Sequence, residues 1–111
     1  MATTTQTPTC KWRGNSGTAY TYYIYKLPTR SWKAEPGNYI FAKVVDGKWR
    51  AIYAGETSDL SSRFTGHHQQ ACIDRNGATH IHAHINRGGD QARRDEERDV
   101  RLRYSPPCNQ Q

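Results

Sequence analysis

The chain has 111 residues, and 16 Lys and Arg against 10 Asp and Glu give it a formal net charge of +6 at pH 7. This length allows one small domain and excludes an enzyme with a separate large cofactor domain. Only 34% of the residues are hydrophobic, so the core must be thin, and no apolar run approaches the roughly 18 residues that a membrane-spanning helix needs.

Residues 1–9 are rich in Thr and carry no charged side chain, and they predict a disordered tail rather than a secretory signal. The three cysteines, Cys10, Cys72 and Cys108, are widely spaced and odd in number. They argue against a disulfide framework and favour a reducing compartment. We therefore expect a cytoplasmic protein of prokaryotic or phage-like type that makes no membrane contact.

The whole positive surplus lies in residues 1–89, because residues 90–111 contain five acids and five arginines. An excess of positive charge suits a polyanionic partner, most simply nucleic acid, or serves solubility alone. If a nucleic acid binds, we expect most of the surface that tracks its phosphates to lie in the first four-fifths of the chain.

The first half of the chain predicts three strands, at 19–27, 38–45 and 48–54. Asp46-Gly47 is a hairpin turn signal between the second and third of these. Tyr39 and Tyr53 should therefore lie on neighbouring antiparallel strands. We expect all three segments to form an antiparallel meander.

The second half predicts helices around one more strand. A helix should begin at Thr57 or Ser58 and run to about His67, with Asp59 favourable in its first turn. Asp90 should be the N-cap of the last helix. The further elements are expected at 69–75 (helix), 79–85 (strand) and 90–104 (helix). This order predicts an α+β (mixed α/β) fold with a small three-to-four-stranded, mainly antiparallel sheet flanked by helices.

Four residues of the last helix share one stripe: Arg93, Glu97, Val100 and Tyr104. Val100 and Tyr104 are the expected core contacts, so Glu97 should point inward, whereas Asp95 and Glu96 should face solvent. An inward carboxylate must be paired or must bind a metal ion, because burying a bare charge is costly. Two interpretations stay open: an ion pair with Arg93 or another arginine, or a metal ligand.

Two tyrosines on adjacent strands precede a helix that carries Arg63 and His67 one turn apart. These four side chains could converge on one point. Hydrolysis of a phosphodiester needs a proton acceptor for water, a cation for the phosphate and a metal ion for the leaving oxygen. The alternatives are that Tyr39 and Tyr53 only pack in the core and that Arg63 pairs with Asp59.

The order of these residues resembles the GIY-YIG nuclease family, and within it the N-terminal nuclease domain of the bacterial excision-repair endonuclease. The segments that carry the resemblance are Gly37-Asn38-Tyr39, Tyr53-Ala54-Gly55, 57–63, His67, Glu97, Pro106 and Asn109. They span nearly all of the expected folded part. We accordingly divide the chain into a tail (1–9), an N-terminal extension with a strand (10–36) and a nuclease core (37–111).

The resemblance implies a role for each matching residue. Glu97 would bind one Mg²⁺ or Mn²⁺ ion, and Arg63 would bind the scissile phosphate. Tyr39, Tyr53 and His67 would orient or deprotonate the attacking water, and the choice of base among them stays open. Supporting positions are Gly37, Gly55 and Asn109, of which Asn109 would brace Glu97 or the backbone beside it.

The chain departs from the family pattern at three positions. Asn38 and Ala54 replace the middle residues of the two short motifs, which we expect to affect packing only. Glu56 stands where many family members have Lys. This change removes any role of a lysine in activating water and adds a carboxylate that could join the metal environment.

A rival site is the strand face with His80, His82 and His84. Neutral imidazoles bind zinc or nickel, but the first and last of these residues are about 13 Å apart at a strand rise of about 3.3 Å per residue. We therefore expect this face to meet solvent or DNA and to become cationic in mild acid.

The sequence thus predicts a metal-dependent endonuclease that hydrolyses phosphodiester bonds in DNA, with RNA as the other candidate substrate, in DNA repair or restriction. Further contacts to the nucleic acid are expected from Lys43, Lys48, Arg50 and His68. Specificity would come from a homodimer or a larger complex. The alternatives are a catalytically inactive nucleic-acid-binding module of the same fold and a His-rich metal-binding protein.

Overall fold

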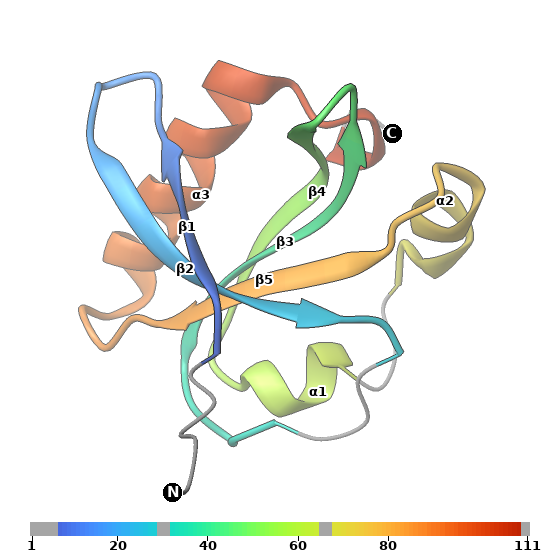
Figure 1. The fold of residues 1–111 in the computed structure, drawn as a ribbon. Coiled ribbons are helices and arrows are strands. Elements are labelled where there is room, and N and C mark those ends of the chain that lie inside the picture. Colours follow the sequence, from blue (N-terminus) through green and yellow to red (C-terminus); the bar gives the residue numbers. More distant parts are fainter. Residues whose placement is uncertain (1–6, 29–31, 65–67, 110–111) are drawn as a thin grey trace, which may run out of the picture.

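The computed structural model describes residues 7–28, 32–64 and 68–109, and it contains a curled, fully antiparallel five-stranded sheet (Figure 1). The strands lie in the order β1-β2-β5-β3-β4. Their bounds are β1 (Thr9–Arg13), β2 (Ala19–Lys26), β3 (Gly37–Val45), β4 (Lys48–Thr57) and β5 (His80–Ile85). The helices are α1 (Leu60–Phe64), α2 (Gln70–Arg75) and α3 (Asp90–Tyr104), followed by the single 3₁₀ turn η1 (Pro107–Asn109). The predicted α+β class is confirmed, with five strands in the described part of the chain.

The predicted meander of the first three strands is wrong. Strand β5 lies between β2 and β3, and Ala83 pairs with Tyr23 on one side and with Tyr39 on the other. Strand β1 pairs with β2, so Thr9 belongs to the sheet and not to a tail. Alternating hydrophobicity identifies a strand but carries no information about its neighbours, which is why the order was missed.

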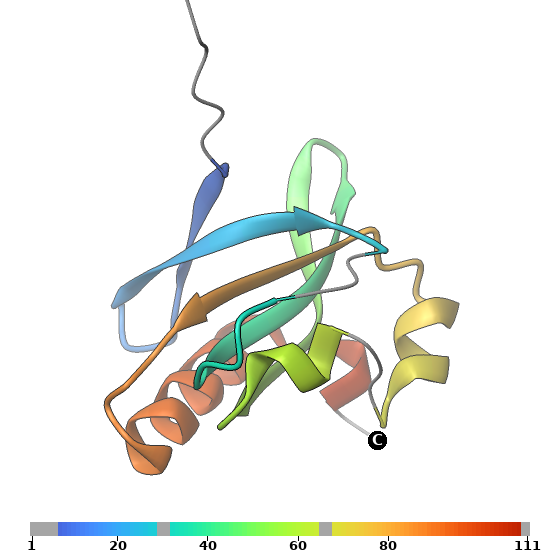
Figure 2. The same cartoon turned by 90° about the horizontal axis from the view of Figure 1, so that it is seen from below.

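Strand β3 is buried on both faces, and each face forms part of a separate core. On one face Tyr39 and Phe41 pack with Leu60 of α1 and Ile73 of α2. On the opposite face the core contains Ile40, Ala42, Trp12, Tyr22 and Val100 of α3. In Figures 1 and 2, α1 and α3 accordingly lie on opposite sides of the sheet.

Helix starts differ by one or two residues from the prediction. Asp59 is the N-cap of α1, because its Oδ1 accepts a hydrogen bond from the backbone N–H of Ser61 at 3.0 Å. Thr57 precedes Asp59 by two residues, and its hydroxyl oxygen accepts a hydrogen bond from the Asp59 N–H. In α3 the N-cap is Gly89, and Asp90 is the first helical residue, where its charge suits the helix dipole.

The three histidines of β5 do not form an exposed face, which corrects the prediction. His82 is fully buried, and its Nδ1 accepts a hydrogen bond from Trp12 Nε1 at 3.0 Å. His84 is bound to Glu96, and the ring of His80 lies edge-on to Trp49. The Trp and Glu side chains that contact these histidines lie far away from them in the sequence. Their contacts allow this polar strand face to lie in the interior of the protein.

A disulfide joins Cys72 of α2 to Cys108 of η1, contrary to the prediction. The two cysteines are separated by 36 residues, and only the folded sheet brings α2 and η1 together. Cys10 is the third, free cysteine and is partly buried. The odd number of cysteines was therefore a misleading sign, and it gives no argument for a reducing compartment.

Among the described residues, no helix combines the length and the apolar character needed to cross a membrane.

Acid should weaken the fold through His82. Burial lowers the pKa of His82 from 6.5 to about 4, so the unfolded chain takes up this proton at a higher pH than the folded protein. Stability is therefore complete above about pH 6.5 and falls as the pH drops towards 4. Between pH 7 and pH 5 we expect urea unfolding to report a loss of about 2 kcal/mol from this residue. In His82→Leu this part of the loss should vanish, and an unchanged loss would contradict the assignment.

Reduction should destabilise the protein. A loop of this length favours the folded state by roughly 2–4 kcal/mol when it is closed by a disulfide. We expect dithiothreitol, or the double substitution of Cys72 and Cys108 by Ser, to lower the free energy of unfolding by that amount. The Cys10→Ser variant should lose just as much on reduction, because Cys10 lies outside the disulfide. Equal stability of the oxidised and reduced proteins would contradict the pairing.

Candidate functional site

Two tyrosine rings from adjacent strands stack at one edge of the sheet. The ring centroids of Tyr39 on β3 and Tyr53 on β4 are 6.1 Å apart, with 25° between the ring planes. Tyr39 pairs across the strands with Gly55. A Cβ atom at Gly55 would lie 2.4 Å from Cζ of Tyr39, so only glycine lets the ring take this place.

The other motif glycine also has a packing reason. A Cβ atom at Gly37 would lie 2.2 Å from the carbonyl oxygen of His84 and 2.5 Å from Cδ1 of Leu60. Glycine thus allows β3, β5 and α1 to meet where β3 begins. The next residue, Asn38, does more than the expected packing: its buried Nδ2 donates to the carbonyl oxygen of Arg93 and ties β3 to α3.

Arg63 of α1 and Glu97 of α3 both act on the two tyrosines. Burial raises the pKa of Tyr39 and of Tyr53 above the usual value of 10, and in both cases Glu97 raises it further while Arg63 lowers it. A hydrogen bond also joins the two phenols. Arg63 and Glu97, from helices α1 and α3, therefore each lie within electrostatic reach of both tyrosines. Of the four side chains that we expected to converge from their order in the sequence, the structure brings Tyr39, Tyr53 and Arg63 together, and Glu97, which only the resemblance added, joins them.

Arg63 lacks the partner that the packing alternative would give it. Its Nε is buried and has no hydrogen-bond partner in the part of the chain that the structure describes. Asp59 does not serve it, because Asp59 Oδ1 accepts from the backbone and hydroxyl of Ser61. A buried guanidinium N–H without an acceptor is costly, and an anionic ligand would satisfy it.

Glu97 is a half-buried carboxylate on the flank of α3 that faces β4. Burial raises its pKa, Arg101 and Arg94 lower it, and Glu56 raises it. Its ion pair with Arg101 is long, at 3.8 Å between Nη1 and Oε1. The carboxylate therefore stays available to a further cation.

The prediction that Glu96 faces solvent is wrong. Glu96 is 5% exposed, and its Oε2 accepts from the Tyr22 hydroxyl and lies 2.5 Å from His84 Nε2. Glu96 precedes Val100 by four residues and Glu97 precedes it by three, so both lie on the same side of the helix. Spacing alone could not tell which carboxylate enters the core and which stays at its rim.

Arg93 does not pair with Glu97. Its Nε donates to Glu56 Oε2 at 3.0 Å, and it also bonds Asp90 at the start of α3. Glu56 is therefore held by an ion pair rather than free to join a metal environment, although its charge is felt at Glu97. This pair fixes the end of β4 to α3.

Asn109 braces β4 and not Glu97. Its Oδ1 accepts from the backbone N–H of Ala54 at 2.8 Å, and its Nδ2 donates to the carbonyl oxygen of the same residue at 2.9 Å. Ala54 lies between Tyr53 and Gly55, so this double hydrogen bond holds the strand that carries the site. The disulfide at the neighbouring Cys108 anchors Asn109 in turn.

A basic groove runs past Glu97, and we use this name for two adjoining hollows that share Ser105. The hollow beside the β3–β4 hairpin contains the predicted phosphate contacts Lys43, Lys48 and Arg50, with Arg103 from α3. The hollow along α3 is lined by Glu97 and by three arginines, Arg94, Arg98 and Arg101. Net-neutral α3 thus contributes positive charge to the groove, which the charge count by segment missed.

The spacing of those three arginines is the sequence signal that could have indicated the positive face of α3. Arg94, Arg98 and Arg101 follow each other at four and three residues and share one face of α3. The fourth predicted contact, His68, is placed differently: its ring lies edge-on to Tyr53, with centroids 5.9 Å apart. His67 lies outside the described residues.

The described residues include no group of three or more His, Cys, Asp or Glu side chains arranged to hold a metal ion. The His-rich alternative therefore has no site in the described ranges. Glu97 presents a different case, because Mg²⁺ is commonly held by one or two carboxylates together with waters and substrate phosphates. A rim carboxylate whose charge is disfavoured by burial fits such an ion.

Comparisons of the chain with protein-family models, with curated proteins and with solved structures find no match in any of the three.

Neutralising Glu97 should stabilise the metal-free protein. Because burial disfavours the charged carboxylate, we expect Glu97→Gln to raise the free energy of unfolding at pH 7 by about 0.5–1 kcal/mol. Thermal unfolding in EDTA measures this. Asp95→Asn is the matched control, since Asp95 is exposed on the same helix and should change little. A Glu97→Gln variant that is clearly less stable than the parent would show that Glu97 has a structural role.

Proposed function

We propose that this protein is a divalent-metal-dependent endonuclease of the GIY-YIG type that hydrolyses phosphodiester bonds in DNA. One observation carries the proposal: Tyr39 of β3 and Tyr53 of β4 lie together at one edge of the sheet, and Arg63 of α1 and Glu97 of α3 each act electrostatically on both of them. An ion-pair cluster with a purely structural role would not need two stacked phenols, a guanidinium N–H without a hydrogen-bond acceptor or a carboxylate that is only half-buried.

In this proposal Arg63 binds the phosphate that is attacked. The guanidinium is permanently charged and presents its donors as a planar fork that matches phosphate oxygens. The buried Nε without a partner is the atom that such an oxygen would satisfy. Arg63 would thereby balance the charge that develops on phosphorus during attack.

Tyr39 and Tyr53 would position the attacking water. Both phenols stay protonated in the metal-free protein, because burial raises their pKa. As neutral groups they donate and accept hydrogen bonds, and one of them can take a proton only when a neighbouring cation lowers its pKa. The proton acceptor is one of Tyr39, Tyr53 and His67.

Glu97 would hold one Mg²⁺ or Mn²⁺ ion, which supplies Lewis-acid stabilisation of the leaving oxygen when bound. Glu97 and Arg63 act on the same two phenols from helices on opposite faces of the sheet, and this supports a cation and a phosphate that both lie close to Tyr39 and Tyr53. Glu56 would remain paired with Arg93 and would add negative charge nearby without binding the ion.

The basic groove would carry the DNA backbone to this point. Lys43, Lys48 and Arg50 lie on the hairpin side of Ser105, and the arginines of α3 lie on the Glu97 side. Contacts to phosphates fix position without reading sequence, so we expect low intrinsic specificity and propose that a homodimer or larger complex adds it. The proposed setting is repair or restriction of DNA in the cytoplasm, with RNA as a second substrate to test.

A catalytically inactive binding module of the same fold is the second candidate. The observation that favours it is Glu56, whose charge raises the pKa of Glu97 at the position where a lysine would lower it. Such a module would use the same basic groove and would bind DNA without cutting it.

Incubation of supercoiled plasmid with the protein and Mg²⁺ or Mn²⁺ should give nicked and linear products, and EDTA should prevent them. We expect Glu97→Gln and Arg63→Ala to reduce the cleavage rate at least about 100-fold, because each removes charge stabilisation that is specific to the transition state.

The matched control is Arg75→Ala, which removes an exposed arginine of α2 and should cut at the parent rate. DNA binding without cleavage under every divalent cation would favour the inactive module. Cleavage that continues unchanged in Glu97→Gln would refute the metal assignment.

A further inference from the structure

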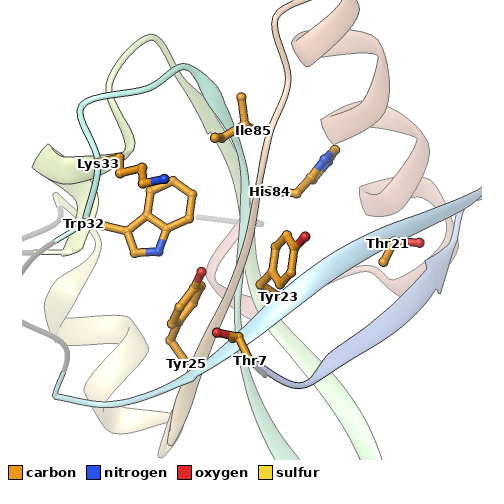
Figure 3. Close-up of a pocket in the computed structure, with 8 residues that line it drawn as sticks. All are labelled: Thr7, Thr21, Tyr23, Tyr25, Trp32, Lys33, His84 and Ile85. Atoms are coloured by element: carbon orange, nitrogen blue, oxygen red, sulfur yellow. The ribbon is translucent and has the colours of Figure 1, made fainter. Parts of the chain in front are cut away.

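A separate hollow, which we call the aromatic groove, lies on β2 and β5 away from Glu97 and the basic groove (Figure 3). Its walls include Tyr23 and Tyr25 of β2, Trp32 and Lys33 of the segment before β3, and Ile85 at the end of β5. Figure 3 shows the rings of Tyr25 and Trp32 on one side of the β5 ribbon and the ring of Tyr23 on the other, with the amine of Lys33 above Trp32. Neither the candidate site nor the cores explain why Tyr23 lies exposed in this hollow.

Part of the aromatic groove is rigid. The rings of Tyr25 and Trp32 meet edge to face, with centroids 5.7 Å apart and 80° between their planes. Both side chains also pack against the core on the α1 side of the sheet. Tyr23, by contrast, is 45% exposed, and it is one of three large hydrophobic residues exposed in the described part of the chain. The result is a fixed aromatic wall beside a ring that is open to a ligand.

The charge of the aromatic groove restricts what the ligand can be. None of its eight lining residues is acidic, and Lys33 is an exposed cation at its rim. Flat apolar faces next to a cation suit a planar ring that carries a negative charge close by, which describes a nucleobase on its phosphate backbone. A base within a duplex is already stacked on both faces, so the ligand must be unpaired.

The position of Tyr23 relates the aromatic groove to the candidate site. Tyr23 and Tyr39 both pair with Ala83, so their side chains project from the same face of the sheet in one row across three strands. Two strand spacings separate their backbones, which is about 10 Å, or roughly three base steps of nucleic acid. One short stretch of substrate can therefore reach both places.

We propose that the aromatic groove binds an unpaired nucleobase of the nucleic acid, with the base stacked on Tyr23 and its phosphate close to Lys33. The preferred substrate would then contain a bulge, gap or single-stranded end a few nucleotides from the point of cleavage. This inference rests on the proposed function only in taking a nucleic acid as the partner.

The test compares two duplexes by fluorescence anisotropy in EDTA at fixed salt, one with a single bulged thymine and one with an abasic residue at the bulge. The protein should bind the thymine bulge roughly tenfold more tightly, since stacking of one base on an aromatic ring has an effect of this size. Tyr23→Leu should abolish the difference, whereas Tyr23→Phe, which keeps the ring, should preserve it. Val44→Ala is the control for loss of an exposed apolar side chain elsewhere.

Equal affinity for the two duplexes, or an undiminished difference in Tyr23→Leu, would overturn the proposal. The proposal would also be overturned if the protein self-associated and Tyr23→Leu abolished this self-association without changing the binding of either duplex. The occupant of the groove would then be a second copy of the chain. A failure of the nuclease proposal alone would give a different result. Plasmid would stay intact with every metal ion, but the protein would still bind the duplex with the bulged thymine more tightly.

Discussion

The structure depends on the burial of β3 on both faces. Tyr39 and Phe41 point into the core with α1, and Ile40 and Ala42 point into the core with α3. Because the strand is covered from both sides, the two helices approach the neighbouring edge strand β4 from opposite faces. Arg63 and Glu97 come within reach of the same pair of tyrosines for this reason. A sheet with one solvated face could not bring both helices to a single edge.

The edge strand is fixed by contacts that lie outside the sheet ladder. Asn109 binds both backbone groups of Ala54, and Glu56 pairs with Arg93 of α3. The disulfide holds the turn that presents Asn109. An edge strand has free backbone groups, so these attachments both protect it and keep Tyr53 in place. The disulfide thus belongs to the support of the candidate site as much as to the stability of the fold.

Local patterns predicted what depends on neighbouring residues. The Asp46-Gly47 turn and the alternation on either side of it were enough to pair Tyr39 and Tyr53 on adjacent strands. The two motif glycines were also identified from the sequence, and their packing explains them. Pairing over long distances was not predictable in the same way. The insertion of β5 between β2 and β3 and the bond between Cys72 and Cys108 join segments whose separation carries no local signal.

Which of Glu96 and Glu97 is buried depends on both local spacing and long-range pairing. Both acids lie on the helix side that carries Val100, and only the partners Tyr22 and His84 on β2 and β5 decide that Glu96 is the buried one. Those partners were themselves misplaced by the predicted topology. The distribution of charge on α3 was likewise not visible in its net charge, which is zero. Three of its arginines face the basic groove, whereas Asp99 accepts hydrogen bonds from Ser16 and Tyr20 on another side of the helix.

The most direct test of the account is a crystal structure of the protein with Mn²⁺ and a short duplex whose scissile phosphate is replaced by a phosphorothioate. The account predicts an anomalous manganese peak at the Glu97 carboxylate, about 2 Å from its oxygen, and a phosphate group in contact with the Arg63 guanidinium. Manganese bound away from Glu97, or DNA seated on a face that leaves Arg63 without a phosphate, would contradict it.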